Sequence, residues 1–349
     1  MNRTTPRPLV VRCGALGDMV LLTPLLALLH RRYGLPPDVL TSGGWSAPLY
    51  AGHADVHQVL LTGSRRRPYW LHPRQWQLVR TLATAGRRPV YVCDELATGP
   101  LARLLHRAGF RDQDLLWVGE HPECARTHWV DRWLAFGALD APGWHGVANA
   151  RVAPTPTLFI RESAQGDCAR WLARRHWSHR PLLLLHAGNK RTFKRGGGRG
   201  RFRDSKAWPD GRWIAMLRAM HARVPEAVIL LTGTPPEQPW LADLAQGSRL
   251  NCVHAIGNDL PLARLLALQS RALGMVSVDT GPAHSAAALG CPILVLYGGA
   301  SAEAWLPRTP NPGTVQWLGG LDAGRTRLLD TGVDEAIAAW NTLPLRMPT

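Results

Sequence analysis

Three short motifs in the chain combine glycine with polar side chains that could bind or transfer a charged group. The first is the turn Gly14-Ala-Leu-Gly17-Asp18, which follows the apolar run Leu9–Arg12 and precedes a long apolar segment. As a helix N-cap, Asp18 would accept backbone N–H groups and complement the helix dipole. As a general base, it would take a proton from a substrate hydroxyl. The two roles do not exclude each other, and the residues alone leave both open.

The second motif is Asp279-Thr280-Gly281-Pro282-Ala283-His284, which ends a predicted strand and begins an alanine-rich helix. Glycine permits close approach of a ligand to the backbone, and proline suits the first position of a helix. The N–H groups and dipole of such a helix start suit a phosphate or diphosphate. A core helix capped by Asp279 or Thr280 is the alternative prediction.

The third motif is His186-Ala-Gly188-Asn189, which is followed by a basic, glycine-rich segment (residues 190–205) and by Lys206-Ala-Trp-Pro209. All three lysines of the chain, Lys190, Lys194 and Lys206, fall in this stretch. Lysine point charges and forked arginines suit phosphate oxygens, so the segment could cover an anionic ligand. A solvated loop is the alternative, and the sequence does not say which lysine contacts a diphosphate.

Two further patterns concern ribose and metal binding. Glu237 follows a predicted strand and turn, where a carboxylate can accept ribose hydroxyls, although a helix-start acid is the simpler interpretation. The tripeptide Asp112-Gln-Asp114 has the form that metal-dependent sugar transferases use, but it precedes a strand, and the histidines show no ligand spacing. We therefore predict no metal and no cofactor.

Composition limits the class of protein and its partners. The chain of 349 residues carries a formal charge of +16, which favours phosphorylated substrates, polyanions or an anionic membrane surface. No nucleic-acid-binding signature occurs, so a nucleic-acid partner rests on charge alone. The six cysteines are scattered singly, which favours a reducing compartment such as the cytoplasm. The longest apolar stretch, Met19–Leu29, is too short to span a membrane.

Strand-like and helix-like segments alternate twice along the chain, which predicts an α/β protein made of two doubly wound parallel sheets. The irregular segment 140–157 is the predicted linker. We therefore expect a first domain at 1–150, a second at 151–333 that opens with a strand at Leu158–Ile160, and a terminal helix within 334–349 that could pack back toward the first domain. Ligands of such folds bind at the carboxyl ends of strands, so we expect the domains to face each other across a cleft.

In order and separation, the motifs resemble those of glycosyltransferase family 9, the heptosyltransferases of the lipopolysaccharide inner core. The resemblance rests on Arg12 to Pro24, on Lys206-Ala-Trp-Pro209, and on Asp279 to His284 with the Ala-Ala-Leu-Gly290 that follows. It implies a GT-B fold of two Rossmann-like domains, with the acceptor mainly on the first and the nucleotide sugar mainly on the second.

The resemblance also implies inverting, metal-independent transfer of a heptose-like sugar from a nucleotide sugar, typically ADP-heptose, to an anionic glycolipid at the inner face of the inner membrane. Asp18, in its turn with Gly14 and Gly17, would be the catalytic base. The remaining roles implied are diphosphate contacts from Lys206, Thr280, Gly281, Pro282, Gly188 and Asn189, a ribose contact from Glu237, and sugar contacts from Asp279 and His284. Another GT-B enzyme, such as a nucleotide-sugar epimerase or lipid-linked sugar transferase, and a non-catalytic nucleotide- or nucleic-acid-binding protein are the alternatives.

Overall fold

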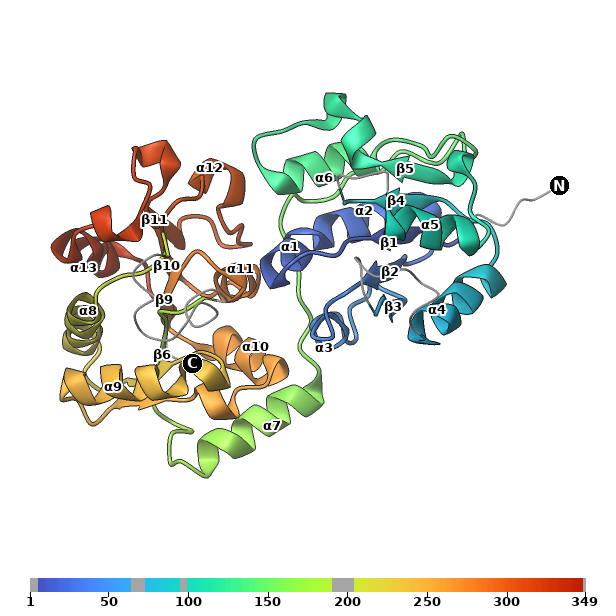
Figure 1. Ribbon diagram of the computed structural model, residues 1–349. Coiled ribbons are helices and arrows are strands. Elements are labelled where there is room, and N and C mark those ends of the chain that lie inside the picture. The colour runs from blue at the N-terminus through green and yellow to red at the C-terminus, as the bar shows by residue number, and fades with distance from the viewer. Residues whose placement is uncertain (1–5, 64–72, 95–98, 190–203, 348–349) are drawn as a thin grey trace. The chain divides into compact units, whose positions relative to one another are not determined.

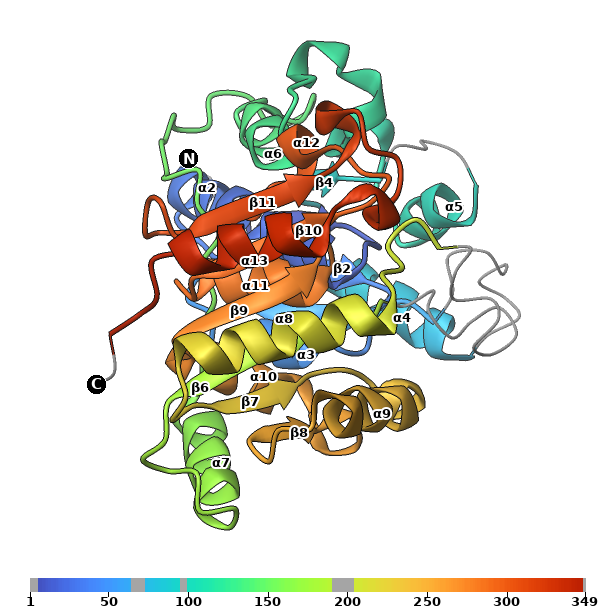
Figure 2. The same cartoon turned by 90° about the vertical axis from the view of Figure 1, so that its left-hand side faces the viewer.

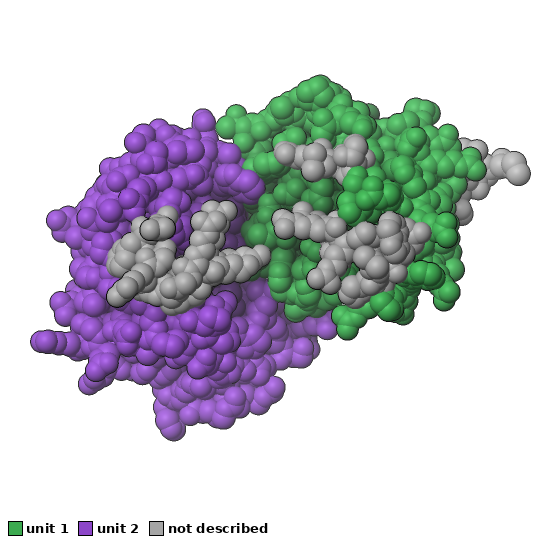
Figure 3. Space-filling model, in the orientation of Figure 1, with its two compact units in different colours: residues 1–159 green, residues 160–349 purple. Residues whose placement is uncertain are grey.

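The chain forms two compact units, residues 1–159 and residues 160–349, which Figure 3 shows in green and purple. The computed structural model describes residues 6–63, 73–94, 99–189 and 204–347. Lys190 and Lys194 lie outside these residues, as does most of the basic segment 190–205. The boundary between the units falls just after the irregular segment 140–157.

The first unit is built on a five-stranded, fully parallel sheet in the order β3-β2-β1-β4-β5 (Figure 1). Its strands are β1 (Leu9–Val11), β2 (Asp38–Thr41), β3 (Gln58–Leu61), β4 (Val90–Val92) and β5 (Leu115–Trp117). Its helices are α1 (Leu16–Leu21), α2 (Thr23–Tyr33), α3 (Ser46–Leu49), α4 (Pro73–Thr84), α5 (Pro100–Arg107) and α6 (Trp129–Gly137).

Successive side chains of the central strands enter opposite faces of this sheet, as strand geometry requires. Leu9 and Val11 of β1 pack in one apolar cluster with residues of α4 and α5. On β4, Val90 and Val92 join that cluster, whereas the ring of Tyr91 meets the Phe136 ring of α6 edge to face. A parallel sheet covered by helices on both faces explains why its strands read as continuous apolar runs.

The apolar segment after Asp18, predicted as one helix reaching Arg32, forms two helices. Helix α1 ends at Leu21 and α2 begins at Thr23, because Pro24 has no N–H to donate to the carbonyl of Val20. The hydroxyl of Thr23 donates to that carbonyl instead, at 3.0 Å. The short α1 therefore belongs to the turn that carries Asp18.

The second unit contains a six-stranded parallel sheet in the order β11-β10-β9-β6-β7-β8. Its strands are β6 (Leu182–His186), β7 (Val228–Leu231), β8 (Val253–Ala255), β9 (Gly274–Val278), β10 (Ile293–Tyr297) and β11 (Val315–Gly319). Its helices are α7 (Glu162–Ala173), α8 (Asp210–Arg223), α9 (Gln238–Ser248), α10 (Leu262–Arg271), α11 (Gly281–Ala288), α12 (Ala302–Trp305) and α13 (Val333–Thr342).

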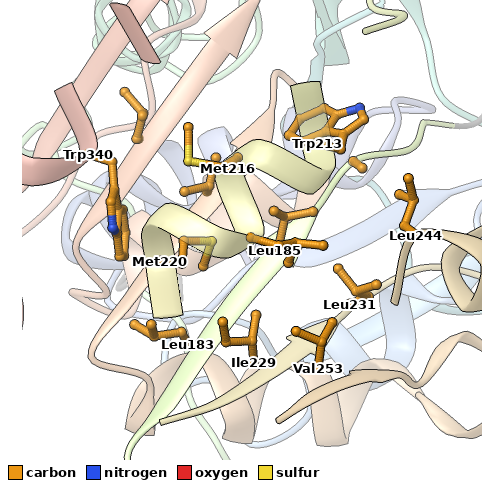
Figure 4. Packing of buried hydrophobic residues seen from close by; sticks show 14 of the residues in the cluster. Leu183, Leu185, Trp213, Met216, Met220, Ile229, Leu231, Leu244, Val253 and Trp340 are labelled. Atoms are coloured by element: carbon orange, nitrogen blue, oxygen red, sulfur yellow. The ribbon is translucent and has the colours of Figure 1, made fainter. Parts of the chain in front are cut away.

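Helices cover both faces of this sheet as well. Leu183 and Leu185 of β6 pack with Trp213 and Met216 of α8 and with Trp340 of α13 (Figure 4). The alternate residues of β6 face the opposite cluster, which includes residues of α7, α10 and α11. Figure 2 shows α8 and α13 over the same face of the sheet, so the predicted terminal helix packs within the second unit.

Two features of the structure differ from the secondary structure predicted for the second domain. Residues 158–160, predicted to open the second alternation as a strand, have no regular secondary structure. Strand β11 was not predicted, because its sequence Val315-Gln-Trp-Leu-Gly319 is short and mixed in polarity. As an edge strand, β11 leaves the Trp317 side chain exposed and so lacks the apolar run of a central strand.

The order of the strands marks where each unit can bind a ligand. In the first sheet the chain leaves β1 toward β2 and β3 and then returns to the other side of β1 to form β4. In the second sheet the corresponding reversal lies between β6 and β9. Ligands of open parallel sheets bind at the carboxyl ends of the two strands that flank such a reversal.

Candidate functional site

Asp18 lies in the loop after β1, beside the strand reversal of the first unit. It is the third residue of α1, and its Oδ2 accepts the backbone N–H of Ala15 at 2.6 Å. Its Oδ1 accepts a hydrogen bond from Nη2 of Arg12 at 2.8 Å. The carboxylate thus interacts with the start of its helix, as in the capping prediction, and its side chain remains 18% exposed.

Glycine is required beside this carboxylate. A Cβ atom at Gly14 would lie 2.4 Å from the Cβ of Asp18, which is far inside van der Waals contact. Gly17 is buried in the first turn of α1. The spacing of the two glycines therefore lets the backbone fold closely around Asp18.

Two residues that the sequence analysis did not assign complete the surroundings of Asp18. Arg12, directly after β1, donates from Nη1 to the carbonyl of Cys93 at 2.8 Å and to Oδ1 of Asp94 at 3.4 Å. Burial would lower the pKa of Arg12, but its carboxylate neighbours, Asp18 foremost, outweigh that effect and raise the pKa. Arg12 therefore stays charged.

In the second unit, Lys206 and Asp279 form an ion pair beside the strand reversal. The Lys206 Nζ donates to the carbonyl oxygen and to Oδ2 of Asp279, at 2.6 Å each. His284, buried on α11, places Nε2 at 4.0 Å from the other carboxylate oxygen of Asp279. The structure thus brings together three of the predicted residues from two segments that lie 73 positions apart.

Asp204, which the sequence analysis did not select, connects the third motif to this ion pair. Its Oδ2 accepts from Nδ2 of Asn189 at 2.6 Å, and its Oδ1 accepts from the backbone N–H of Lys206 at 3.2 Å. The next residue, Ser205, packs so closely on Gly298 after β10 that a Cβ there would lie 2.3 Å from the Ser205 carbonyl oxygen. These contacts hold Lys206 in place at the carboxyl end of the sheet.

Helix α11 begins directly beside Lys206. Thr280 occupies the N-cap position in an extended conformation, and Gly281 and Pro282 form the first two helical residues. The Thr280 hydroxyl donates to the carbonyl of Val278 at 3.1 Å and does not cap the helix. An ammonium next to the positive end of a helix dipole is an arrangement that suits a diphosphate.

The two carboxylate oxygens of Glu237 differ in their hydrogen bonds. Its Oε2 accepts from the backbone N–H and the hydroxyl of Thr234, at 2.8 and 2.7 Å. Its Oε1 has no hydrogen-bond partner among the residues that the structure describes. A buried acceptor without a partner is costly, and a ligand hydroxyl would satisfy it. The carboxylate is thus both the helix-start acid and a possible hydroxyl acceptor.

Gly188 and His186 surround that carboxylate from the end of β6. A Cβ at Gly188 would lie 2.0 Å from Oε1 of Glu237. Burial lowers the pKa of His186, and the nearby charge of Glu237 opposes this shift without reversing it. The His186 Nδ1 lies 3.0 Å from the hydroxyl of Thr232. Gly188 and His186 thus lie close to the Glu237 carboxylate at the end of β6.

Replacing Gly188 by Ala is expected to destabilise the second unit by about 1–3 kcal/mol, the usual cost of overpacking. The new methyl group must displace the Glu237 carboxylate, which Thr234 holds through two hydrogen bonds. Urea unfolding followed by tryptophan fluorescence measures the loss.

Gly211→Ala is the matched control, because a Cβ at this position of α8 meets no atom within 4 Å. Alanine is the better helix former, so this variant should be stabilised by about 0.5–1 kcal/mol. Equal stabilities of the two variants would show that Gly188 does not contact Glu237.

The structure gives no sign of a metal centre within the residues it describes, where no three His, Cys, Asp or Glu side chains gather as ligands. Asp114 of the Asp112–Asp114 tripeptide is buried and accepts hydrogen bonds from Arg87 and Trp144. All six cysteines are buried and free. Across the same described residues, every helix falls short of the length and apolarity needed to cross a bilayer.

Comparison with known proteins points to one family of glycosyltransferases. Residues 199–318 match the model of glycosyltransferase family 9 (heptosyltransferase). A segment of 106 residues is 30% identical to lipopolysaccharide heptosyltransferase 3 of Escherichia coli, and it covers 30% of this chain and 31% of that relative. The chain thus aligns with about a third of that relative's length. The predicted resemblance to this family is confirmed.

Solved structures extend the likeness in fold to nearly the whole chain. E. coli ADP-heptose lipopolysaccharide heptosyltransferase II superposes with a TM-score of 0.71 at 18% identity, over 97% of this chain and 98% of that one. The E. coli heptosyltransferase WaaC with ADP gives 0.66 at 18% identity, over 94% and 97% of the two chains. The predicted α/β fold of GT-B type is confirmed.

Proposed function

We propose that this protein is an inverting glycosyltransferase that moves a heptose-like sugar from a nucleotide sugar, ADP-heptose by preference, to an anionic glycolipid of the lipopolysaccharide core. The observation that carries the proposal is the Lys206–Asp279 ion pair at the start of α11. It lies inside residues 199–318, the segment that matches the heptosyltransferase family.

The donor would bind to the second unit through three kinds of contact. Lys206 and the Thr280-Gly281-Pro282 helix start would hold the diphosphate, assisted by Gly188 and Asn189. The unpartnered oxygen of Glu237 would accept a ribose hydroxyl. Asp279, which binds Lys206, and His284, which lies beside Asp279, would contact the sugar. The solved WaaC structure contains ADP, which supports adenine as the base of the donor.

Transfer would then proceed in one displacement. Asp18 takes the proton of the acceptor hydroxyl while the oxygen forms a bond to the anomeric carbon of the sugar. The bond between that carbon and the diphosphate breaks, and its electron pair leaves with the diphosphate oxygen. Lys206 and the α11 dipole offset the charge that develops there, so the protein itself supplies the positive charge and a metal is not required.

The acceptor and the place of action follow from charge and resemblance. A formal charge of +16 favours an anionic glycolipid, and the free cysteines fit a reducing compartment. We therefore place the reaction at the cytoplasmic face of the inner membrane, where salt should weaken an electrostatic association.

A nucleotide screen by thermal stabilisation tests this proposal. A ligand that binds only the native state raises the melting temperature, and at equal concentration the tighter ligand raises it more. ADP should raise the melting temperature more than UDP or GDP, and ADP-heptose should be consumed when lipopolysaccharide core from a deletion strain is added. Preference for UDP would support another GT-B enzyme. Salt-sensitive DNA binding without turnover of any nucleotide sugar would support a non-catalytic binding protein.

A further inference from the structure

Arg12 is held between two carboxylates that come from different parts of the first unit. Nη2 donates to Oδ1 of Asp18 at 2.8 Å, and Nη1 lies 3.4 Å from Oδ1 of Asp94. Nη1 also donates to the backbone carbonyl of Cys93 at 2.8 Å. One terminal nitrogen of Arg12 thus binds the proposed base, and the other binds residues at the end of β4.

Two aromatic side chains lie beside this guanidinium. Its Cζ atom lies 5.3 Å from the ring centroid of Trp133 and 5.8 Å from that of Trp129, both on α6. Cation–π contacts at such distances attract an arginine and restrict its rotamers. Arg12 is therefore constrained by β4 and α6, neither of which carries a residue assigned to the reaction.

Asp94 is anchored independently of the arginine. Both of its oxygens lie 3.3 Å from the backbone N–H of Cys13, the residue that follows Arg12. The carboxylate therefore pulls together the ends of β1 and β4, the two strands that flank the reversal of the sheet. A buried ion pair adds little to the free energy of unfolding on average, because the cost of desolvating the two charges offsets their attraction. Stability alone therefore does not explain the arrangement of Arg12, Asp18 and Asp94.

We propose that Arg12 is a positioning residue that holds the Asp18 carboxylate aimed at the acceptor hydroxyl, and that Asp94 orients Arg12 for this task. The inference rests on the proposed function, because it assigns the arrangement to the activation of that hydroxyl. With Oδ1 held by Arg12 and Oδ2 held by Ala15, the carboxylate has a single orientation, and the remaining lone pairs face a fixed direction.

Chemical rescue distinguishes positioning from support of the fold. In Arg12→Ala, kcat should fall roughly 10–10²-fold, as for a misplaced catalytic group, while KM for the donor stays unchanged. Millimolar guanidinium should restore part of this kcat, whereas urea, a neutral molecule of the same shape, should not.

Further variants test the fork and the role of Asp94. Arg12→Lys keeps the charge but loses the fork of two donor nitrogens, so its kcat should lie between those of the parent and Arg12→Ala. Asp94→Asn should lower kcat less than Arg12→Ala does, and it should have little further effect in the Arg12→Ala background. Arg87→Ala is the control, since Arg87 is an ion-paired arginine of the same unit remote from this network.

The outcomes also separate this inference from the proposed function. If the parent protein turns over ADP-heptose but Arg12→Ala keeps full kcat, the positioning role is wrong and the glycosyltransferase assignment stands. A loss of kcat that guanidinium and urea restore equally, or that neither restores, would indicate filling of space or support of the fold and would overturn the proposal. A parent protein without any transfer would reject the proposed function itself.

Discussion

Asp18→Asn is expected to lower turnover roughly 10²–10⁴-fold, the usual contribution of a general base, with donor affinity nearly unchanged. An amide has almost the shape of the carboxylate but cannot take the proton of an attacking hydroxyl. It can still accept either the Ala15 N–H or the Arg12 hydrogen bond, so α1 keeps much of its support. Initial rates with ADP-heptose and lipopolysaccharide core, measured alongside ADP calorimetry, give the two quantities.

Asp112→Asn provides the matched control, because the Asp112 side chain is 97% exposed and pairs with the surface residue His106. It should leave turnover, ADP affinity and melting temperature as in the parent. Asp18→Asn could instead have a lower melting temperature and a lower ADP affinity but an unchanged turnover per folded molecule. That result would show that the carboxylate is mainly a helix cap and that another residue acts as the base.

The sequence predicted the parts of the site that are local along the chain. Gly14 and Asp18 are four positions apart, so the glycine turn and the carboxylate at its end are visible in one short motif. The same holds for Asp279 and His284, which share a strand end and a helix start. Short-range backbone preferences of glycine, proline and aspartate are enough to place such residues.

Contacts made by strand pairing were not predictable in this way. Asp94 reaches Arg12 across 82 positions, because β4 pairs in parallel with β1 and their ends meet at the same edge. In the sequence, Arg12 was only the first residue of a motif. Its contact with Asp94 could be identified only once the strand order was known. Asp204 likewise binds both Asn189 and Lys206. It lies in a loop, and no periodic pattern in the sequence predicts the course of a loop.

The fold was predictable wherever apolar runs marked buried strands, and less so at the edges. The central strands β6 and β10 are fully buried and stand out as almost continuous apolar segments. Edge strand β11 is only partly buried, so it does not need the apolar sequence of a central strand. The same limit applies to the break between α1 and α2, which depends on one proline within an apolar run.

Lys206→Ala is expected to weaken ADP binding roughly 10–100-fold, which corresponds to the 1.5–3 kcal/mol of a hydrogen bond to a charged group. The ammonium is already ordered by two hydrogen bonds to Asp279 beside the start of α11. A diphosphate arriving there gains a charge partner whose conformational entropy is largely lost beforehand. Isothermal titration with ADP and with AMP, which lacks the second phosphate, measures the effect.

The comparison of the two nucleotides separates a lost phosphate contact from a damaged fold. If Lys206 contacts the β-phosphate, Lys206→Ala loses the preference for ADP over AMP while AMP affinity changes little. Removing the ammonium also leaves the carboxylate of Asp279, which is 9% exposed, without its ion pair, and damage from this source would weaken both nucleotides together. Lys190→Ala and Lys194→Ala are the parallel variants, because the sequence offers all three lysines for the diphosphate. Lys206→Ala could instead keep the parent's preference for ADP over AMP, while Lys190→Ala or Lys194→Ala loses it. That result would assign the diphosphate contact to Lys190 or Lys194 and would leave the Lys206–Asp279 pair a purely structural contact.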